Sequence, residues 1–339
     1  MSGISHNRPT LGIEEEQAAV RVIHSGWLAQ GKEVETFENE FCDFLGIPHG
    51  HAVAVSSGTA ALYLALCALN AQGKKVALPV YSCSALRNAV AMSGSQAVFI
   101  DTSPGSPNVT CDVLNASGAE VVIVPHMYGL PIDLTNVGNI DVIEDCAQAL
   151  GAAVKGMPVG LQGKIGVYSF YATKLITSGG QGGLIASRER SLADSIRDYR
   201  EFDCRHDRKN RFNFQMTDLQ AAIGRIQLSK LPTFLARRSE IFDHYKSAGL
   251  NMLDVMSGTG SVPVRYRAVM KTSLVEEIIA SLKAKGVKAI VPIEDWELLD
   301  TSTAYPNAFR ITRETVSLPI YPSLSDVEVE TVISAVGKR

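Results

Sequence analysis

The segment GKIGVYSFYATK, residues 163–174, places a lysine after an apolar strand and before a glycine-rich turn. Its β-branched and aromatic residues predict a strand at 165–171, and the glycines of SGGQGG at 178–183 permit close approach of a ligand. An isolated lysine is usually a solvated surface charge. A lysine at this place, however, could form a Schiff base, so Lys174 is a candidate catalytic residue.

Outward from this segment, short apolar runs alternate with helical patterns. Most runs are continuously apolar, as in strands that are buried on both faces of a sheet. Helices are predicted at 14–25, 34–45, 59–69 and 84–92. The pattern predicts an α/β fold whose sheet is covered on both faces, with roughly seven strands at 52–55, 76–80, 97–100, 121–124, 140–143, 165–171 and 183–186.

The pattern of predicted helices and strands changes from about residue 231. The chain then predicts a helix at 233–248, short strands within 261–270, and helices at 274–285 and 325–336. A length of 339 residues favours about two domains. We therefore expect a large domain at 20–230 and a smaller α+β domain at 231–339, which could also include residues 1–19.

The composition indicates an ordinary globular protein without a polyanionic partner. Lysine and arginine total 32 against 35 acidic residues, without a long block of one sign, which favours neither nucleic acid nor a membrane surface. There is no apolar run of about 18 residues and no signal-like N-terminus. The six cysteines lack C-x-x-C spacing. We expect a cytoplasmic protein without a metal site.

Reactive residues follow two further predicted strands, and open α/β sheets bind ligands at the carboxyl ends of strands. SSGTA at 56–60 begins an apolar helix whose free N–H groups suit a phosphate, although such residues are also common helix caps. The strand at 140–143 runs into Glu144 and Asp145. A carboxylate at Asp145 could keep a ring nitrogen protonated, or it could cap the segment that follows.

The order and spacing of these motifs resemble the DegT/DnrJ/EryC1/StrS aminotransferases, fold-type I pyridoxal-phosphate enzymes that mostly aminate nucleotide-linked ketosugars. The resemblance covers nearly the whole chain and implies a mostly parallel seven-stranded sheet in the large domain. It rests on SGW at 25–27 with Gly31, SGTAAL at 57–62, HMYG at 126–129, EDCAQ at 144–148, SFYATK at 169–174, Asn213 with MTDLQAA at 216–222, and SLP at 317–319.

The resemblance assigns roles around the cofactor ring. Lys174 would carry pyridoxal 5'-phosphate as a Schiff base and later move a proton between the substrate carbon and the cofactor. Asp145 would bond the pyridinium nitrogen, and Gln148 would contact the ring hydroxyl. The family usually has an aromatic residue stacked on the ring at the position of Cys83, so this position departs from the pattern, and Tyr81 could compensate.

The resemblance also implies a phosphate site and a homodimer. Gly58, Thr59 and Ser169 would hold the phosphate. Asn213 is distant from them in sequence and would reach the phosphate of the neighbouring subunit, so that active sites are shared. The basic run at 205–211 precedes Asn213 and is either a solvated loop or a contact for a substrate diphosphate.

The sequence departs from the family pattern at two further positions, and it contains several other candidate residues. Gln181 and Gln215 stand where Glu and Arg are usual, and the second domain is short for the family. HGH at 49–51 is predicted as a surface loop rather than a metal pair. The aromatic and histidine candidates for substrate contact are Trp27, Tyr128 and His126, and core packing is an equal alternative for the first two.

The implied reaction is transfer of an amino group, with glutamate as donor, to a keto group of a nucleotide-linked sugar. Retention of Lys174 favours amine transfer over the dehydratase branch, in which histidine replaces this lysine. Two alternatives remain at this stage. The acceptor could be a non-nucleotide keto compound such as a cyclitol ketone, or the protein could bind the cofactor as a regulatory protein without turnover.

Overall fold

The computed structural model describes residues 3–255, 258–300 and 303–337. Within them, seven strands form one sheet in the order β1-β9-β8-β5-β4-β2-β3. Strand β9 is antiparallel to both neighbours, and the other strands run parallel to one another. The predicted mostly parallel sheet is confirmed, with strands β1 (Ala52–Val55), β2 (Lys75–Pro79), β3 (Gln96–Ile100), β4 (Val121–Pro125), β5 (Asp141–Asp145), β8 (Ile165–Ser169) and β9 (Gly183–Ala186).

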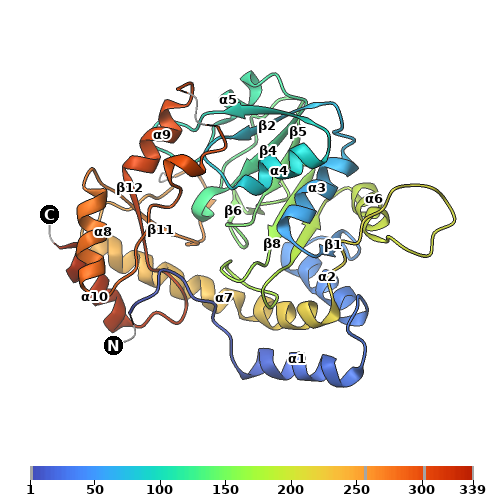
Figure 1. Ribbon diagram of the computed structural model, residues 1–339, viewed down its shortest axis with the longest axis horizontal. Helices are drawn as coiled ribbons and strands as arrows, with labels where there is room; N and C mark the ends of the chain where they lie inside the picture. Colours follow the sequence, from blue (N-terminus) through green and yellow to red (C-terminus); the bar gives the residue numbers. More distant parts are fainter. Residues whose placement is uncertain (1–2, 256–257, 301–302, 338–339) are drawn as a thin grey trace.

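Side chains of these strands alternate between two apolar layers. Val53 and Val55 of β1 pack with helices α3 (Gly58–Ala68), α4 (Ser84–Met92) and α6 (Arg190–Arg200), whereas Ala52 and Ala54 pack with α2 (Lys32–Leu45) and α7 (Asp218–Ser247). Helix α1 (Ile13–Ser25) lies against α7 on the outside (Figure 1). Because helices cover both faces, most strands are buried along nearly their whole length, whereas the edge strand β3 is exposed at Gln96 and Ala97.

The C-terminal elements surround a separate apolar cluster. Strands β11 (Ala268–Lys271) and β12 (Thr315–Leu318) pair antiparallel, and helices α8 (Val275–Ala284) and α10 (Asp326–Val336) pack with them and with the end of α7. The N-terminal segment joins this part, because Ile4 hydrogen-bonds to the backbone on both sides of Val287 (Figure 1). Helix α9 (Pro306–Arg313) instead packs against the sheet cluster.

Helix α7 differs from the expectation at residues 233–248. It begins at Asp218, after Thr217, whose capping box with Gln220 satisfies N–H groups at the helix start, and it continues through Pro232. A proline removes one helical hydrogen bond, but the buried Leu231 and Phe234 on either side hold this turn against the core. The expected domain boundary at 231 lies within this helix, so the division into 20–230 and 231–339 stays a prediction.

Some short elements had no prediction, because they offer too few turns for a periodic pattern. They are α5 (Cys111–Ala116) and the strands β6 (Ala153–Val154) and β7 (Met157–Pro158). Strand β6 pairs with β7 on one side and with β10 (Ser261–Val262) on the other. Helices α6 and α9 were also missed. No helix in the described part of the chain is long and apolar enough to cross a membrane.

Candidate active site

The carboxyl ends of the parallel strands bring the sequence candidates to one edge of the sheet. Strand β1 leads into Ser57 and Gly58, β5 ends at Asp145, and β8 ends at Ser169. Strands β1, β8 and β5 are close in the sheet order, separated only by the antiparallel β9. The sheet topology therefore places the candidates for the phosphate site and for the ring nitrogen at the same edge of the sheet.

The start of α3 is the candidate site for an anion. The Ser57 hydroxyl accepts a hydrogen bond from Ala60 N–H, as a helix cap does. Among the described residues, the N–H groups of Gly58 and Thr59 have no acceptor. A Cβ added at Gly58 would lie 3.0 Å from Ser169 Cβ. Because Gly58 has no side chain, the space between the two N–H donors and the Ser169 hydroxyl stays open. This arrangement of donors fits a phosphate.

Asp145 is a buried carboxylate with few partners. Asp145 is only 8% exposed, and its Oδ1 atom accepts a hydrogen bond from Ala147 N–H at 3.0 Å. Burial raises the pKa of Asp145, although the Ala147 N–H and the positive charge of Lys174 oppose the rise. The capping interaction is therefore present. The negative charge of this carboxylate is only partly balanced by its neighbours, so the group also fits a cationic ring nitrogen.

Glu144 points to the other side of β5 and has a structural role. It is completely buried and accepts from the N–H groups of Gly160, Gln162 and Gly163 at 2.7–2.8 Å. His126 Nε2 lies 3.0 Å from it, while His126 Nδ1 accepts from Ile132 N–H. These bonds assign the His126 proton to Nε2. His126 is therefore a core histidine that fixes the loop between β4 and β5, rather than a free substrate contact.

Lys174 lies beside Tyr266, a residue that the sequence analysis did not single out. The Lys174 Nζ atom is 5.2 Å from the centre of the Tyr266 ring. Asn7 of the N-terminal segment donates to the carbonyl of Thr173 at 2.8 Å and thereby ties that segment to the lysine turn. Neither residue belongs to a local motif, and only the folded chain brings them to Lys174.

Gln148 and the residues after β4 form a connected wall. Tyr128 adopts a left-handed backbone with φ of 62°, and its N–H donates to Gln148 Oε1 at 2.8 Å. The Tyr128 hydroxyl lies 2.5 Å from that of Tyr81. Both tyrosines are buried, and burial raises the pKa of Tyr81 to about 12. Cys83, at the start of α4, is exposed.

Asn213 lies in an extended segment whose neighbours are packed. Phe212 and Phe214 contact the sheet cluster and the ring of Tyr63, whereas Asn213 is exposed. Ser56 N–H donates to the carbonyl of Phe214 at 2.8 Å. The segment is therefore distant in sequence from the phosphate candidates but adjoins the end of β1 in the same chain.

The loop after α6 carries the basic run and projects from the molecule (Figure 1). Lys209 and Arg211 both pair with Asp198, and Arg211 also pairs with Asp207. Their charges are thus partly compensated within the loop. Gln181 contributes its carbonyl to Ser178 and Gln220, and Gln215 donates to Glu201.

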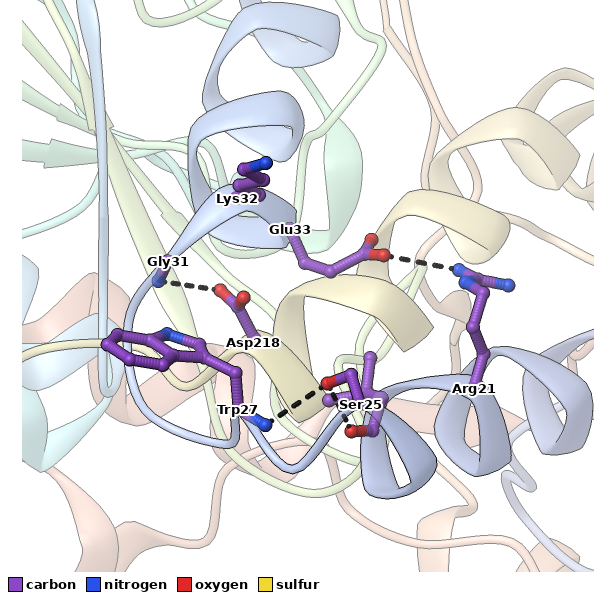
Figure 2. A pocket seen from close by; sticks show the side chains of 8 residues that line it. Arg21, Ser25, Trp27, Gly31, Lys32, Glu33 and Asp218 are labelled. Carbon is purple, nitrogen blue, oxygen red and sulfur yellow. Dashed lines mark hydrogen bonds and ion pairs between the residues drawn. The ribbon is translucent and has the colours of Figure 1, made fainter.

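Trp27 is 61% exposed, so it does not pack in the core. It borders a pocket of about 520 Å³ between α1, α2 and α7, which contains none of the cofactor candidates (Figure 2). Asp218 Oδ1 accepts from Gly31 N–H at 2.7 Å (Figure 2). A Cβ at Gly31 would lie 2.4 Å from Trp27 Nε1. Two of the sequence motifs, at 25–31 and 216–222, therefore meet here.

Comparison with known proteins identifies the family. The model of the DegT/DnrJ/EryC1/StrS aminotransferase family matches residues 9–337. A dTDP-4-dehydro-2,3,6-trideoxy-D-glucose 4-aminotransferase of Saccharopolyspora spinosa is 30% identical, over 97% of this chain and 94% of the relative. A GDP-perosamine synthase of Vibrio cholerae is 28% identical, over 97% and 96% respectively.

Solved structures agree with this result. The aminotransferase TlmJ from Streptoalloteichus hindustanus has a TM-score of 0.91 and 31% identity, with 98% of this chain and 97% of that chain covered. The resemblance seen in the sequence is thereby confirmed. The chain belongs to the DegT/DnrJ/EryC1/StrS aminotransferase family and is a pyridoxal-phosphate-dependent aminotransferase.

Proposed function

We propose that this enzyme transfers an amino group from glutamate to a keto group of a nucleotide-linked sugar. The proposal is carried by one observation: a buried, poorly compensated carboxylate, Asp145, lies within electrostatic reach of Lys174 beside an open phosphate cradle. Two relatives that align over nearly their whole length are named for dTDP- and GDP-linked sugars, which supports a nucleotide sugar as acceptor.

The described residues fit pyridoxal phosphate. Gly58, Thr59 and Ser169 would hold its phosphate, and Asp145 would hold its ring nitrogen. When bound, the cofactor supplies an electron-accepting ring that allows a proton to leave the carbon that bears the amine. Lys174 would bind the cofactor covalently and then carry that proton from one carbon to the other.

Gln148 and Cys83 would complete the ring contacts. The side-chain nitrogen of Gln148 has only Met127 Sδ, at 4.0 Å, as a partner within the described chain, and it is thus able to donate to the ring hydroxyl. Tyr81 is engaged with Tyr128. We therefore assign the contact with the face of the cofactor ring to the Cys83 thiol. This thiol offers a smaller contact surface than the aromatic residue that is usual in the family.

The active enzyme would be a homodimer with shared sites. Asn213 is exposed between two packed phenylalanines, so its amide faces outward, where a second chain can approach. It would donate to the phosphate held by the partner subunit. In this arrangement a monomer lacks one cofactor contact and is inactive.

Amine transfer in two separate half-reactions tests the function. Enzyme loaded with cofactor should release 2-oxoglutarate from glutamate, and the nitrogen left on the enzyme should then appear on one member of a panel of dTDP-, UDP- and GDP-linked ketosugars. Competition by the free nucleotide diphosphate distinguishes this acceptor from a cyclitol ketone. A regulatory protein would release no 2-oxoglutarate with any acceptor, and that result would refute the proposal.

A further inference from the structure

The N-terminal strap, residues 3–10, runs from the C-terminal elements to α1 and is held at both ends (Figure 1). At its start, Ile4 exchanges backbone hydrogen bonds of 2.8 and 2.9 Å with the residues on either side of Val287. At its end, the Thr10 carbonyl accepts from the side chain of Gln227 in α7 at 2.9 Å. The residues between these two anchors therefore keep a defined path across the molecule.

Between its ends, the N-terminal strap meets the turn that carries Lys174. The side-chain nitrogen of Asn7 donates to the carbonyl of Thr173 at 2.8 Å, although the two residues are 166 positions apart in sequence. Residues 8–10 line a small cavity together with Lys174. The strap is thus part of the immediate surroundings of the lysine turn.

The Asn7 bond acts on the peptide group that joins Thr173 to Lys174. Lys174 lies in irregular chain between β8 and β9, so neither strand orients it directly. The N–H of this peptide group belongs to Lys174 and donates to the Tyr171 carbonyl at 2.9 Å. Its carbonyl belongs to Thr173 and accepts from Asn7. Because a peptide group is planar, the two bonds together fix its orientation and thereby the direction in which the Lys174 side chain leaves the backbone.

The surroundings of Asn7 set the orientation of its amide. The amide oxygen accepts from Arg8 N–H at 2.8 Å, which leaves the amide nitrogen to donate to the lysine turn. The preceding residue is anchored as well, because His6 Nε2 lies 2.9 Å from Ser317 Oγ and 3.5 Å from Arg267 Nη1. Asn7 therefore contacts the lysine turn from a segment that is held before and after it.

We propose that Asn7 is a positioning residue for Lys174. By holding the Thr173 carbonyl, it directs the lysine amine towards the place where the cofactor is attached. This inference rests on the proposed function and deepens it, because it names the contact that orients the lysine. A reacting group that is displaced by about 1 Å can react about 10²-fold more slowly, so the loss of this one hydrogen bond should be visible in the chemistry of Lys174.

Two variants and a matched control test this role. Asn7→Ala removes the donor without adding a charge beside Lys174, and Asn7→Gln keeps an amide on a longer side chain. Asn115→Ala is the control, because the Asn115 amide also donates to a backbone carbonyl, at 3.0 Å, and accepts from a backbone N–H, at 2.8 Å. Asn115 belongs to α5, which carries none of the candidate site residues.

The rate of cofactor attachment and the rate of turnover are measured separately. Visible absorption follows the attachment of added pyridoxal phosphate to the cofactor-free protein, and turnover is measured in the loaded enzyme. We expect both rates to fall about 10- to 100-fold in Asn7→Ala, with the KM for glutamate and the urea midpoint close to those of the parent. Asn7→Gln should recover part of both rates, and Asn115→Ala should keep them.

The outcomes separate this inference from the function on which it rests. Parent rates in Asn7→Ala would overturn it, and a raised KM with an unchanged attachment rate would overturn it by placing Asn7 in substrate binding. A lower urea midpoint with an unchanged attachment rate in the folded protein would show a role in stability alone and also overturn it. Attachment needs neither glutamate nor a ketosugar. If the parent transferred no amine, the proposed function would fail, while slower attachment in Asn7→Ala would still support the role of Asn7.

Discussion

Replacement of Asp145 by asparagine should affect the cofactor-free and the cofactor-loaded protein in opposite directions. The carboxylate is buried, and burial raises its pKa above the ordinary value of 3.8. A carboxyl group whose pKa is raised by folding stabilises the protein fully only below its unfolded pKa and loses this contribution as pH rises through its folded pKa. Asparagine has no charge to desolvate and keeps the acceptor for Ala147 N–H.

The magnitude follows from the loss of a buried charge pair in the loaded enzyme. Such a loss costs about 3–5 kcal/mol, which corresponds to a release of 2-oxoglutarate slowed by about 10²- to 10⁴-fold. The cofactor-free variant should be at least as stable as the parent at pH 8, and its advantage should shrink towards pH 4. Urea unfolding followed by circular dichroism measures the stability, and rapid mixing with glutamate measures the rate.

The combination of the two measurements is decisive for Asp145. If the variant were less stable than the parent at pH 8 and released 2-oxoglutarate at the parent rate, Asp145 would only cap the segment after β5. Asp141→Asn is the matched control, because it changes the same residue type on the same strand. Asp141 is paired with Lys164 at the half-buried first residue of β5, so its loss should change neither quantity greatly.

Two further predictions follow from neighbouring residues. Burial acts to raise the pKa of Glu144, but the His126 bond and the N–H groups of Gly163 and Gly160 outweigh it, so the pKa is lowered. Glu144→Gln leaves at least one N–H without an acceptor and should reduce the free energy of unfolding by about 2–4 kcal/mol near pH 7. The loss should be smaller below about pH 4, where the carboxylate of the parent becomes protonated. An unchanged urea midpoint would contradict this structural role of Glu144. Mixing Lys174→Ala with Asn213→Ala subunits should restore activity towards half of wild type in the heterodimer fraction, because one site then carries neither defect. No recovery would place Asn213 in its own chain's site.

The sheet and the strand-end candidates could be predicted from the sequence because both depend on local patterns. Continuous apolar runs indicate strands that are buried on both faces, and parallel strands necessarily align their carboxyl ends. Ser57, Asp145 and Ser169 therefore fell at one edge. The resemblance added the roles, and the family comparison confirmed the resemblance.

Other features depend on contacts that no local pattern reveals. Glu144 and Asp145 are adjacent acidic residues, yet one is saturated with N–H donors and the other is poorly compensated. Trp27 was a candidate for core packing, but the turn held by Asp218 exposes it. Arg267 resembles any basic residue in sequence, and only the lack of an acidic partner among the described residues distinguishes it from Arg265.

The position of the covalently bound cofactor tests the role of Lys174 most directly. Purified enzyme is reduced with borohydride and digested, and the peptide that carries the mass of the reduced cofactor is sequenced. We expect label on Lys174, unchanged labelling in Lys164→Ala, and no label in Lys174→Ala. Label on any other lysine of the parent enzyme would contradict the assignment of Lys174 as the residue that carries the cofactor.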